Sequence, residues 1–193
     1  FHFLTGWFSW FADALHLVTV SGEVTGTVRL WQADHPEHDV VAALDVSTEG
    51  VKFIDAKQFV TWSFGGAAQL WTIDGKKSFL LGTQGDFVQN VTLSPDKKNL
   101  LIFLNNGVGQ LWESQSGKLL TEFQDHDKRI LAASWRNNYL ATASADGTAR
   151  VWALNGGEAL LVLHGHTGYV YGVQWQDDRH LMTYGEDGTV RSW

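Results

Sequence analysis

The chain has 193 residues, of which 44% are hydrophobic and 18% are charged, a composition that predicts one folded domain. Its net charge of −7 argues against a nucleic-acid partner, which requires a basic surface, and the absence of cysteine excludes disulfides and thiolate metal sites. No apolar run is long enough to cross a membrane, so we expect no membrane partner. A chain without cysteine suits a reducing compartment, and we expect an intracellular, cytoplasmic protein.

The N-terminal segment, residues 1–11, is apolar but lacks the basic leader and the small-residue cleavage site of a signal peptide. We interpret this segment as β-strands. From residue 26 onward, one pattern then recurs along the chain: a short segment that begins with glycine and ends with tryptophan. It occurs at residues 26–31, 66–71, 107–112, 147–152 and 188–193, so the tryptophans are 40, 41, 40 and 41 residues apart. A repeat of this length indicates a repetitive architecture of five units.

Each unit has the same internal order of short apolar runs and turn residues. In the last unit we expect strands at residues 159–163, 169–175, 180–184 and 189–193. No segment shows a sustained helical period. Four antiparallel strands in roughly forty residues are typical of one blade of a β-propeller, so the sequence predicts an all-β propeller with five repeats.

The Gly-His, Asp-Gly-Thr and terminal Trp pattern resembles the WD-repeat (WD40) β-propeller family over the whole chain, and most strongly in the last two repeats. The aspartate that usually follows the tryptophan is absent, and Gln32, Thr72, Glu113 and Ala153 stand in its place. Bacterial relatives in this family often sit at the end of signalling ATPases or kinases. The resemblance therefore implies a bacterial-type member, or a fragment of one, that acts as a scaffold or sensor in a larger protein.

The resemblance also implies a buried hydrogen-bonded tetrad in each of the last two blades, in which aspartate, histidine, a hydroxyl and an indole satisfy one another. The residues are His126, Thr142, Asp146 and Trp152 in the fourth repeat, and His166, Thr183, Asp187 and Trp193 in the fifth.

The first three repeats depart from this tetrad, and we expect them to be softer and to depend on apolar packing. The second keeps Thr61 and Trp71 but has Gly65 in the turn, and the third has Ile102 and Asn106. In the first repeat Trp7 replaces the histidine and the turn is longer.

Residues 1–6 match residues 160–165, the outermost strand of a blade, whereas the last repeat ends after its third strand. We therefore expect residues 1–6 to pair with residues 188–193, which makes residues 1–193 a single propeller domain. This phase fits a closed ring of five blades, a piece of a larger propeller, or one part of a ring built from several chains.

No catalytic or cofactor-binding motif is apparent, so we expect neither an enzyme nor a cofactor. A His, Thr and Asp that recur at the same offsets in two repeats are not a catalytic triad, since an active site does not repeat with each blade. His35 and His38 lie in a short polar segment that resembles a metal-ligand cluster. We favour a polar loop and expect no metal site.

Large side chains at the starts of the innermost strands are the candidates for a partner-binding face, which in the family borders the top of the disc. They are Trp7, Phe87, Arg129, Tyr169 and Tyr171, and tryptophan, tyrosine and arginine are residue types that anchor protein interfaces. We expect a non-catalytic scaffold that binds a protein or peptide. The alternative is a propeller that binds a small ligand, such as a glycan or peptide, in or near the central channel.

Overall fold

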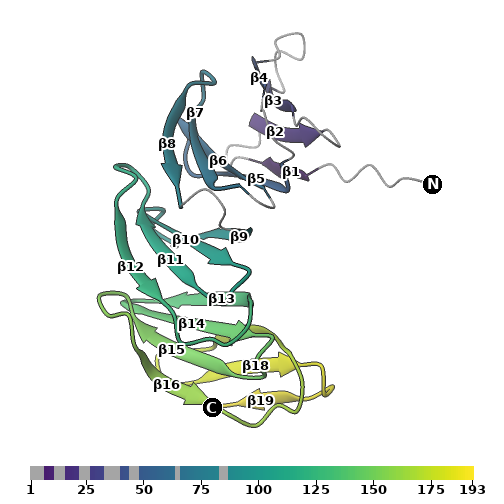
Figure 1. Cartoon of the computed structure of the whole chain (residues 1–193), viewed down its shortest axis with the longest axis vertical. Helices are drawn as coiled ribbons and strands as arrows, with labels where there is room; N and C mark the ends of the chain where they lie inside the picture. Colours follow the sequence, from purple (N-terminus) through teal and green to yellow (C-terminus); the bar gives the residue numbers. More distant parts are fainter. Residues whose placement is uncertain are drawn as a thin grey trace, which may run out of the picture. The chain divides into compact units, whose positions relative to one another are not determined.

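The computed structural model describes residues 7–10, 16–21, 27–32, 40–43, 48–63, 66–82 and 87–193 (Figure 1). The chain divides into two compact units, residues 1–91 with 114–117 and residues 92–113 with 118–193. All regular structure in the described part is β-strand, and no helix there could span a membrane.

The strands form five sheets, and within each sheet the strands follow one another in sequence order. The first contains β1 (Trp7–Trp10), β2 (His16–Ser21), β3 (Thr27–Gln32) and β4 (Val40–Ala43), and the second β5 (Gly50–Phe53), β6 (Gln58–Trp62), β7 (Ala68–Thr72) and β8 (Lys77–Leu81). The third contains β9 (Val88–Leu93), β10 (Asn99–Leu104), β11 (Gly109–Glu113) and β12 (Leu119–Phe123). The fourth contains β13 (Ile130–Arg136), β14 (Tyr139–Ser144), β15 (Ala149–Ala153) and β16 (Ala159–Leu163), and the last β17 (Val170–Trp175), β18 (Leu181–Gly185) and β19 (Val190–Ser192).

These sheets confirm the predicted fold class, an all-β chain of four-stranded antiparallel propeller blades. The last sheet has three strands among the described residues, as the phase of the repeat predicts. Its strands differ by about one residue from the predicted bounds, because β17 begins at Val170 and β18 at Leu181. The predicted pairing of residues 1–6 with residues 188–193 lies outside the described residues and stays a prediction.

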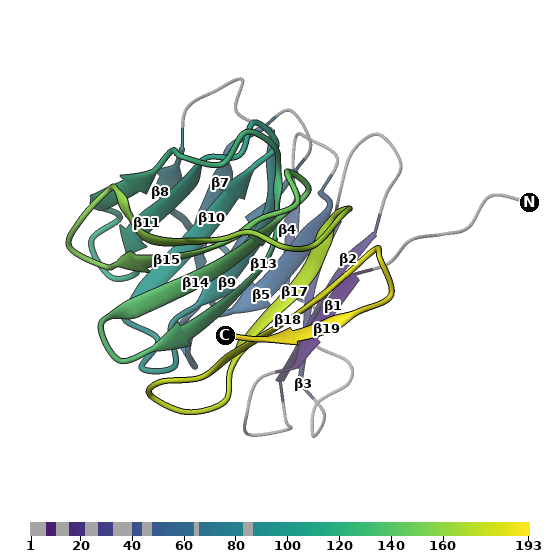
Figure 2. The ribbon, with the colours of Figure 1, turned by 90° about the horizontal axis from the view of Figure 1, so that it is seen from below.

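Neighbouring sheets within a unit pack through apolar faces. In the C-terminal unit β17 lies against β13 and β14 (Figure 2). Ala141, Ala143 and Val151 of the fourth sheet contribute to one cluster with Val173 and Leu181 of the last. The other face of the fourth sheet packs on the third sheet, so its inner strands are buried on both sides, which explains why they are nearly continuous apolar runs.

The N-terminal unit is built in the same way. β5 of the second sheet lies against β1 and β2 of the first. Val18 and Val28 are fully buried there, in one cluster with Phe53, Phe59 and Trp71. The packing of one sheet face on the next therefore recurs in both units.

The hairpin between the second and third strands of a sheet ends in a glycine in the left-handed region. Gly107, Gly147 and Gly188 have φ angles of 91°, 88° and 71°. Residues with a side chain adopt this conformation at a cost, which explains why glycine recurs at this position in the repeat. The turn places the preceding residue, Asp146 or Asp187, beside the start of the sheet.

Candidate functional site

The fourth sheet contains a chain of four hydrogen-bonded side chains. Asp146 Oδ2 is 2.7 Å from His126 Nδ1, and His126 Nε2 is 2.8 Å from Thr142 Oγ1. The indole N–H of Trp152 donates to the same Thr142 hydroxyl at 2.8 Å. The side chain of His126 is fully buried and that of Asp146 is 5% exposed, so each group depends on the others for its hydrogen bonds.

The last sheet repeats this geometry with different residues. Both Asp187 oxygens lie 3.0 Å from His166 Nδ1, and His166 Nε2 is 2.8 Å from Thr183 Oγ1. Trp193 donates its indole N–H to Thr183 Oγ1 at 2.9 Å. The structure thus brings together all eight residues that the sequence assigned to the two tetrads, four in each sheet.

The aspartates have lowered pKa values. Burial alone raises the pKa of Asp146, but hydrogen bonds from His126 and Thr148 outweigh it and hold that pKa well below the ordinary value. For Asp187 the hydrogen bond from His166 is the largest cause of the lowered pKa, and bonds from Thr189 and the backbone add to it. Both carboxylates are therefore ionised at neutral pH.

A second threonine belongs to the hydrogen-bond network in each of the two sheets that carry a tetrad, and its role was not predicted from the sequence. Thr148 donates its backbone N–H and its hydroxyl to Asp146 Oδ1, at 2.8 and 2.6 Å. Thr189 does the same to Asp187 Oδ1, at 3.0 and 2.8 Å. The signal was present in the sequence, because the two Asp-Gly-Thr triplets already included these residues.

The indole-to-hydroxyl bond also occurs in two sheets without the histidine. Trp71 donates to Thr61 at 2.9 Å in the second sheet, and Trp31 donates to Thr19 at 2.9 Å in the first. The third sheet differs: Ile102 is fully buried, and the indole of Trp112 reaches Gln110 Oε1 at 3.3 Å instead. The apolar substitution therefore changes the partner of the tryptophan in that sheet.

The tetrad threonines are poorly placed for chemistry. Thr142 and Thr183 are each only 1% exposed, and each hydroxyl is shared between a histidine and an indole. A nucleophile has to reach a substrate. The arrangement can hold a strand hairpin against the start of its own sheet, which is a structural task.

The exposed candidates of the C-terminal unit lie where first strands begin. Arg129 directly precedes β13, Tyr169 directly precedes β17, and Tyr171 is the second residue of β17. Arg129 is exposed, and Tyr169 and Tyr171 are 37% and 44% exposed. Their ring centroids are 6.4 Å apart in an edge-to-face arrangement.

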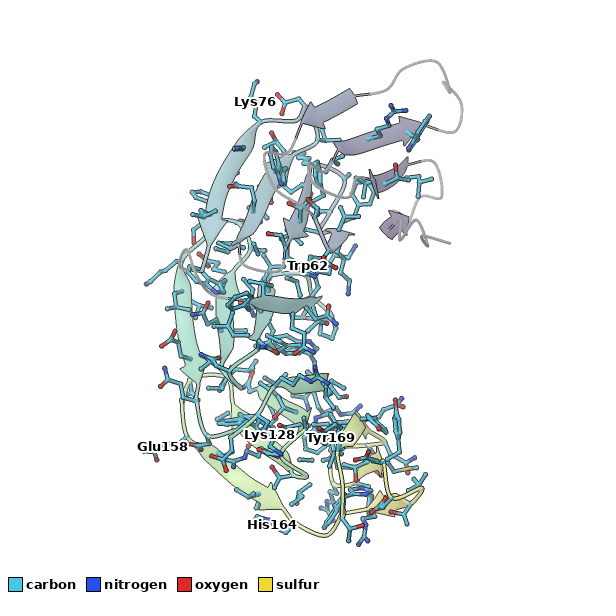
Figure 3. All side chains as sticks on the ribbon, turned by 45° about the vertical axis from the view of Figure 1, so that its right-hand side comes forward. Trp62, Lys76, Lys128, Glu158, His164 and Tyr169 are labelled. Carbon is cyan, nitrogen blue, oxygen red and sulfur yellow. The ribbon has the colours of Figure 1, made fainter. Side chains whose placement is uncertain are left out.

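Lys128 is a further member of this surface that the sequence analysis missed. Its ammonium lies 5.9 Å from the centroid of the Tyr169 ring, and Figure 3 shows the two labelled side chains next to each other. Nothing in the sequence marks Lys128, because the contact joins two sheets. We call Lys128, Arg129, Tyr169 and Tyr171 the strand-start patch.

The backbone beneath the strand-start patch is fixed by hydrogen bonds. The Arg129 carbonyl accepts from Ala145 N at 3.1 Å and from Ser144 Oγ at 3.0 Å. The Tyr169 carbonyl accepts from Glu186 N at 2.8 Å, and Tyr169 N donates to the Glu186 carboxylate at 3.1 Å. The patch thus presents exposed side chains on a fixed backbone.

The other two candidates belong to the N-terminal unit. Phe87 directly precedes β9 and is 52% exposed. Trp7 is the first residue of β1, and its side chain lies outside the described part. His35 and His38 are also outside it, and no group of three or more potential metal ligands occurs among the described residues.

Two segments of the chain match a known repeat family. Residues 117–153 and 157–193 each match the family described as WD domain, G-beta repeat. These segments hold the two complete tetrads.

Curated proteins with similar sequences come from plants, fungi and animals. The chain is 27% identical over 153 residues to "DENN domain and WD repeat-containing protein SCD1" of Arabidopsis thaliana, covering 77% of this chain and 13% of that protein. It is 28% identical over 135 residues to "Shk1 kinase-binding protein 15" of Schizosaccharomyces pombe, covering 70% and 38%. It is 28% identical over 153 residues to the human "F-box-like/WD repeat-containing protein TBL1X", covering 77% and 25%. The chain thus spans well under half of each, and these eukaryotic relatives give no support to the expected bacterial type.

A solved structure shows the same fold. The crystal structure of the computationally designed Ika8 protein matches with a TM-score of 0.75 and 21% identity, covering 93% of this chain and 55% of that one. At this level of identity the match concerns the fold alone.

Proposed function

We propose, on the premise that this is a chain of WD40 repeats, that it is a non-catalytic scaffold or sensor module of a larger protein or complex. WD40 repeats typically serve as protein-binding scaffolds, and we propose that this chain binds a protein or peptide through the strand-start patch. The observation that carries the proposal is the cluster of two exposed tyrosines and two exposed cations on a hydrogen-bonded backbone.

The chemistry of the patch suits an interface. Tyrosine offers a large contact area with few rotatable bonds, and arginine offers several donors in a fixed geometry, so both residue types are enriched among energetically dominant contacts. Because the backbone is already held, the partner does not have to order it on binding. Phe87 and Trp7 remain proposed partner-binding residues of the N-terminal unit.

The tetrads support a non-catalytic role. They occur in two sheets with the same geometry, and their hydroxyls are buried between histidine and tryptophan. We propose that they stiffen the sheets that present the patch. The proposed site of action is the cytoplasm, in keeping with a chain that has no cysteine.

A binding screen with paired variants tests the proposal. The wild-type chain and the double variant Arg129→Ala/Tyr169→Ala are probed with arrays of immobilised peptides, glycans and nucleic acids. We expect peptide ligands of the wild type to bind the variant about thirtyfold more weakly or worse, the loss typical of a hot spot. The melting temperature should stay close to that of the wild type, because both side chains are exposed.

The matched control is Leu161→Ala, which truncates a 57% exposed side chain on β16, away from the patch. It should leave peptide binding unchanged. Ligands found only on the glycan array would favour the small-ligand alternative. Unchanged peptide binding by the double variant would overturn the assignment of the patch.

A further inference from the structure

A hollow lies between the third and fourth sheets, away from the tetrads and the strand-start patch. Its volume is about 480 Å³, and the residues around it come from β10, β11 and β12 on one side and from β14, β15 and the adjoining turns on the other. All of these residues belong to the C-terminal unit. Binding pockets of proteins cover roughly 300–1,000 Å³, so the hollow is large enough for a ligand.

Three asparagines supply most of the polar groups around the hollow: Asn99, Asn138 and Asn155. Within the described part of the chain, none of their carboxamides makes a hydrogen bond to another residue. A carboxamide can donate and accept at once, and so can a peptide group. Three of them on separate segments therefore offer donors and acceptors to the peptide groups of an extended chain.

The apolar part of the lining comprises Leu120 and Tyr139 at the surface, the buried Leu111, and the partly buried Ala153 and Leu154. Leu120 is 44% exposed and Tyr139 is 46% exposed. None of the residues around the hollow carries a positive or negative charge. A phosphate or carboxylate ligand would find no cation here to offset its desolvation, which favours a neutral ligand with an apolar side chain.

Hydrogen bonds fix the wall that joins the two sheets. The Thr121 hydroxyl of β12 donates to the Leu154 carbonyl at 3.2 Å, and Leu154 N donates to the Asn138 carbonyl at 3.0 Å. Gly156 N closes the following turn by donating to the Ala153 carbonyl at 3.1 Å. The hollow is thus formed before any ligand arrives, which lowers the entropic cost of binding.

We propose that this hollow is a second binding surface, which takes an extended, uncharged peptide segment of a partner protein. The three asparagines hold the peptide backbone, and Leu120 and Tyr139 contact an apolar side chain. The proposal goes beyond the strand-start patch, because it assigns a separate site with a different chemistry.

The test selects ligands from a display library of random short peptides on the immobilised wild-type chain, and then measures binding of the enriched peptides, with both ends capped, by fluorescence polarisation. We expect a class of uncharged peptides with a leucine-like or aromatic residue. Their affinity should fall by about tenfold or more in Leu120→Ala and in Asn155→Ala. Both side chains are at the surface, so circular dichroism and the melting temperature should change little.

The repeat provides a matched control. Leu160 occupies in β16 the position that Leu120 occupies in β12, and at 55% exposure it lies outside the hollow. Leu160→Ala should leave the affinity unchanged, and so should Arg129→Ala/Tyr169→Ala, which separates this site from the strand-start patch. Failure to enrich any uncharged peptide, or enriched peptides that bind Leu120→Ala as well as wild type, would overturn the proposal. The proposal would also be overturned by a ligand that binds through Leu120 but is a glycan, as found on the glycan array.

Discussion

At the scale of single residues, His126 depends on Asp146. The imidazole is fully buried, and Asp146 accepts from its Nδ1 as well as from Thr148 and from the backbone N–H of Asp127. Removing the carboxylate leaves several donors without an acceptor. An unsatisfied buried group costs more than the hydrogen bond it had contributed, because its desolvation is no longer compensated.

We therefore expect Asp146→Ala to lower the free energy of unfolding by about 1–3 kcal/mol, measured by urea denaturation. Asn106→Ala is the control, since Asn106 occupies the same place in the third sheet, is exposed, and accepts one backbone bond, from Val108 N at 3.1 Å. It should have the smaller effect. Equal losses in the two variants would contradict the assignment of the tetrad.

The lowered pKa of Asp146 also predicts that the stability of the chain depends on pH. The pKa of Asp146 in the folded chain lies below the ordinary value of 3.8, so the native state favours the ionised form. The contribution of Asp146 to the free energy of unfolding is full at neutral pH. It is lost as the pH falls through 3.8 towards the lower pKa of the folded chain. We expect wild-type stability to fall on acidification over this range.

In Asp146→Asn, stability at neutral pH should already be lower, and the fall on acidification should be shallower. Part of the pH dependence of stability should remain in this variant, because the pKa of Asp187 is also lowered in the folded chain. Denaturation curves at a series of pH values provide the measurement. If the free energy of unfolding of the wild type and of the variant changed in parallel with pH, ionisation of Asp146 would not contribute to the acid dependence.

At the scale of the strand pair, two glycines make room for an aromatic ring on the neighbouring strand. Gly50 pairs with Trp62, and Gly172 pairs with Tyr184, each between the first and second strands of a sheet. A Cβ added to Gly50 would lie 2.1 Å from the Trp62 ring, and one added to Gly172 would lie 2.0 Å from the Tyr184 ring. Either contact forces the ring to move.

The two rings differ in their freedom to move. Trp62 is 8% exposed, whereas Tyr184 is 54% exposed. We expect Gly50→Ala to destabilise the chain by about 1–3 kcal/mol, as overpacking of a core does, and Gly172→Ala to cost less. Thermal and urea denaturation of the two variants compare them directly. A cost for Gly172→Ala equal to that for Gly50→Ala would mean that Tyr184 is held more tightly than its exposure indicates.

The sequence predicted those elements whose signal is local and repeated. The tryptophan period and the turn residues predicted the four-stranded units, and the resemblance to the WD-repeat family implied both sets of four tetrad residues. The hydrogen bond between Trp31 and Thr19 was not predicted from the sequence, because these residues are 12 positions apart instead of the 10 found for Trp71 and Thr61. Yet Thr19 lies opposite Arg29, and Thr61 opposite Gln69, each two residues before its tryptophan, so the register is the same. The longer hairpin of the first sheet hid that equivalence.

Features that join different sheets left no signal in the sequence. Lys128 meets Tyr169 across the boundary between the fourth and last sheets, and the hollow between the third and fourth sheets gathers Asn99 and Asn155 from distant segments. Such contacts depend on how one sheet is placed on the next. Periodicity describes each sheet but does not determine that placement.

At the scale of the whole molecule, the last sheet offers both a face and an edge to a neighbour. In the fourth sheet the pair Ala143 and Ala149 is buried, and this face packs on the last sheet. The equivalent pair in the last sheet is Tyr184 and Val190, at 54% and 63% exposure. The second edge of β19 also has no partner strand among the described residues. Unpaired edges of this kind promote association between chains.

We expect residues 1–6 to supply the missing strand, as their match to residues 160–165 predicts. The test deletes residues 1–6 and compares the variant with the wild type and with a control in which these residues are replaced by a Gly/Ser segment of the same length. If the strand pairs with residues 188–193, both changes should speed backbone hydrogen exchange there and shift the chain towards oligomers in light scattering, because the edge of β19 becomes available. A wild-type chain that is itself an oligomer would favour a ring of several chains. A deletion variant that stays monomeric with unchanged exchange would rule out the pairing, because an edge that loses its partner strand also loses the hydrogen bonds that slow exchange.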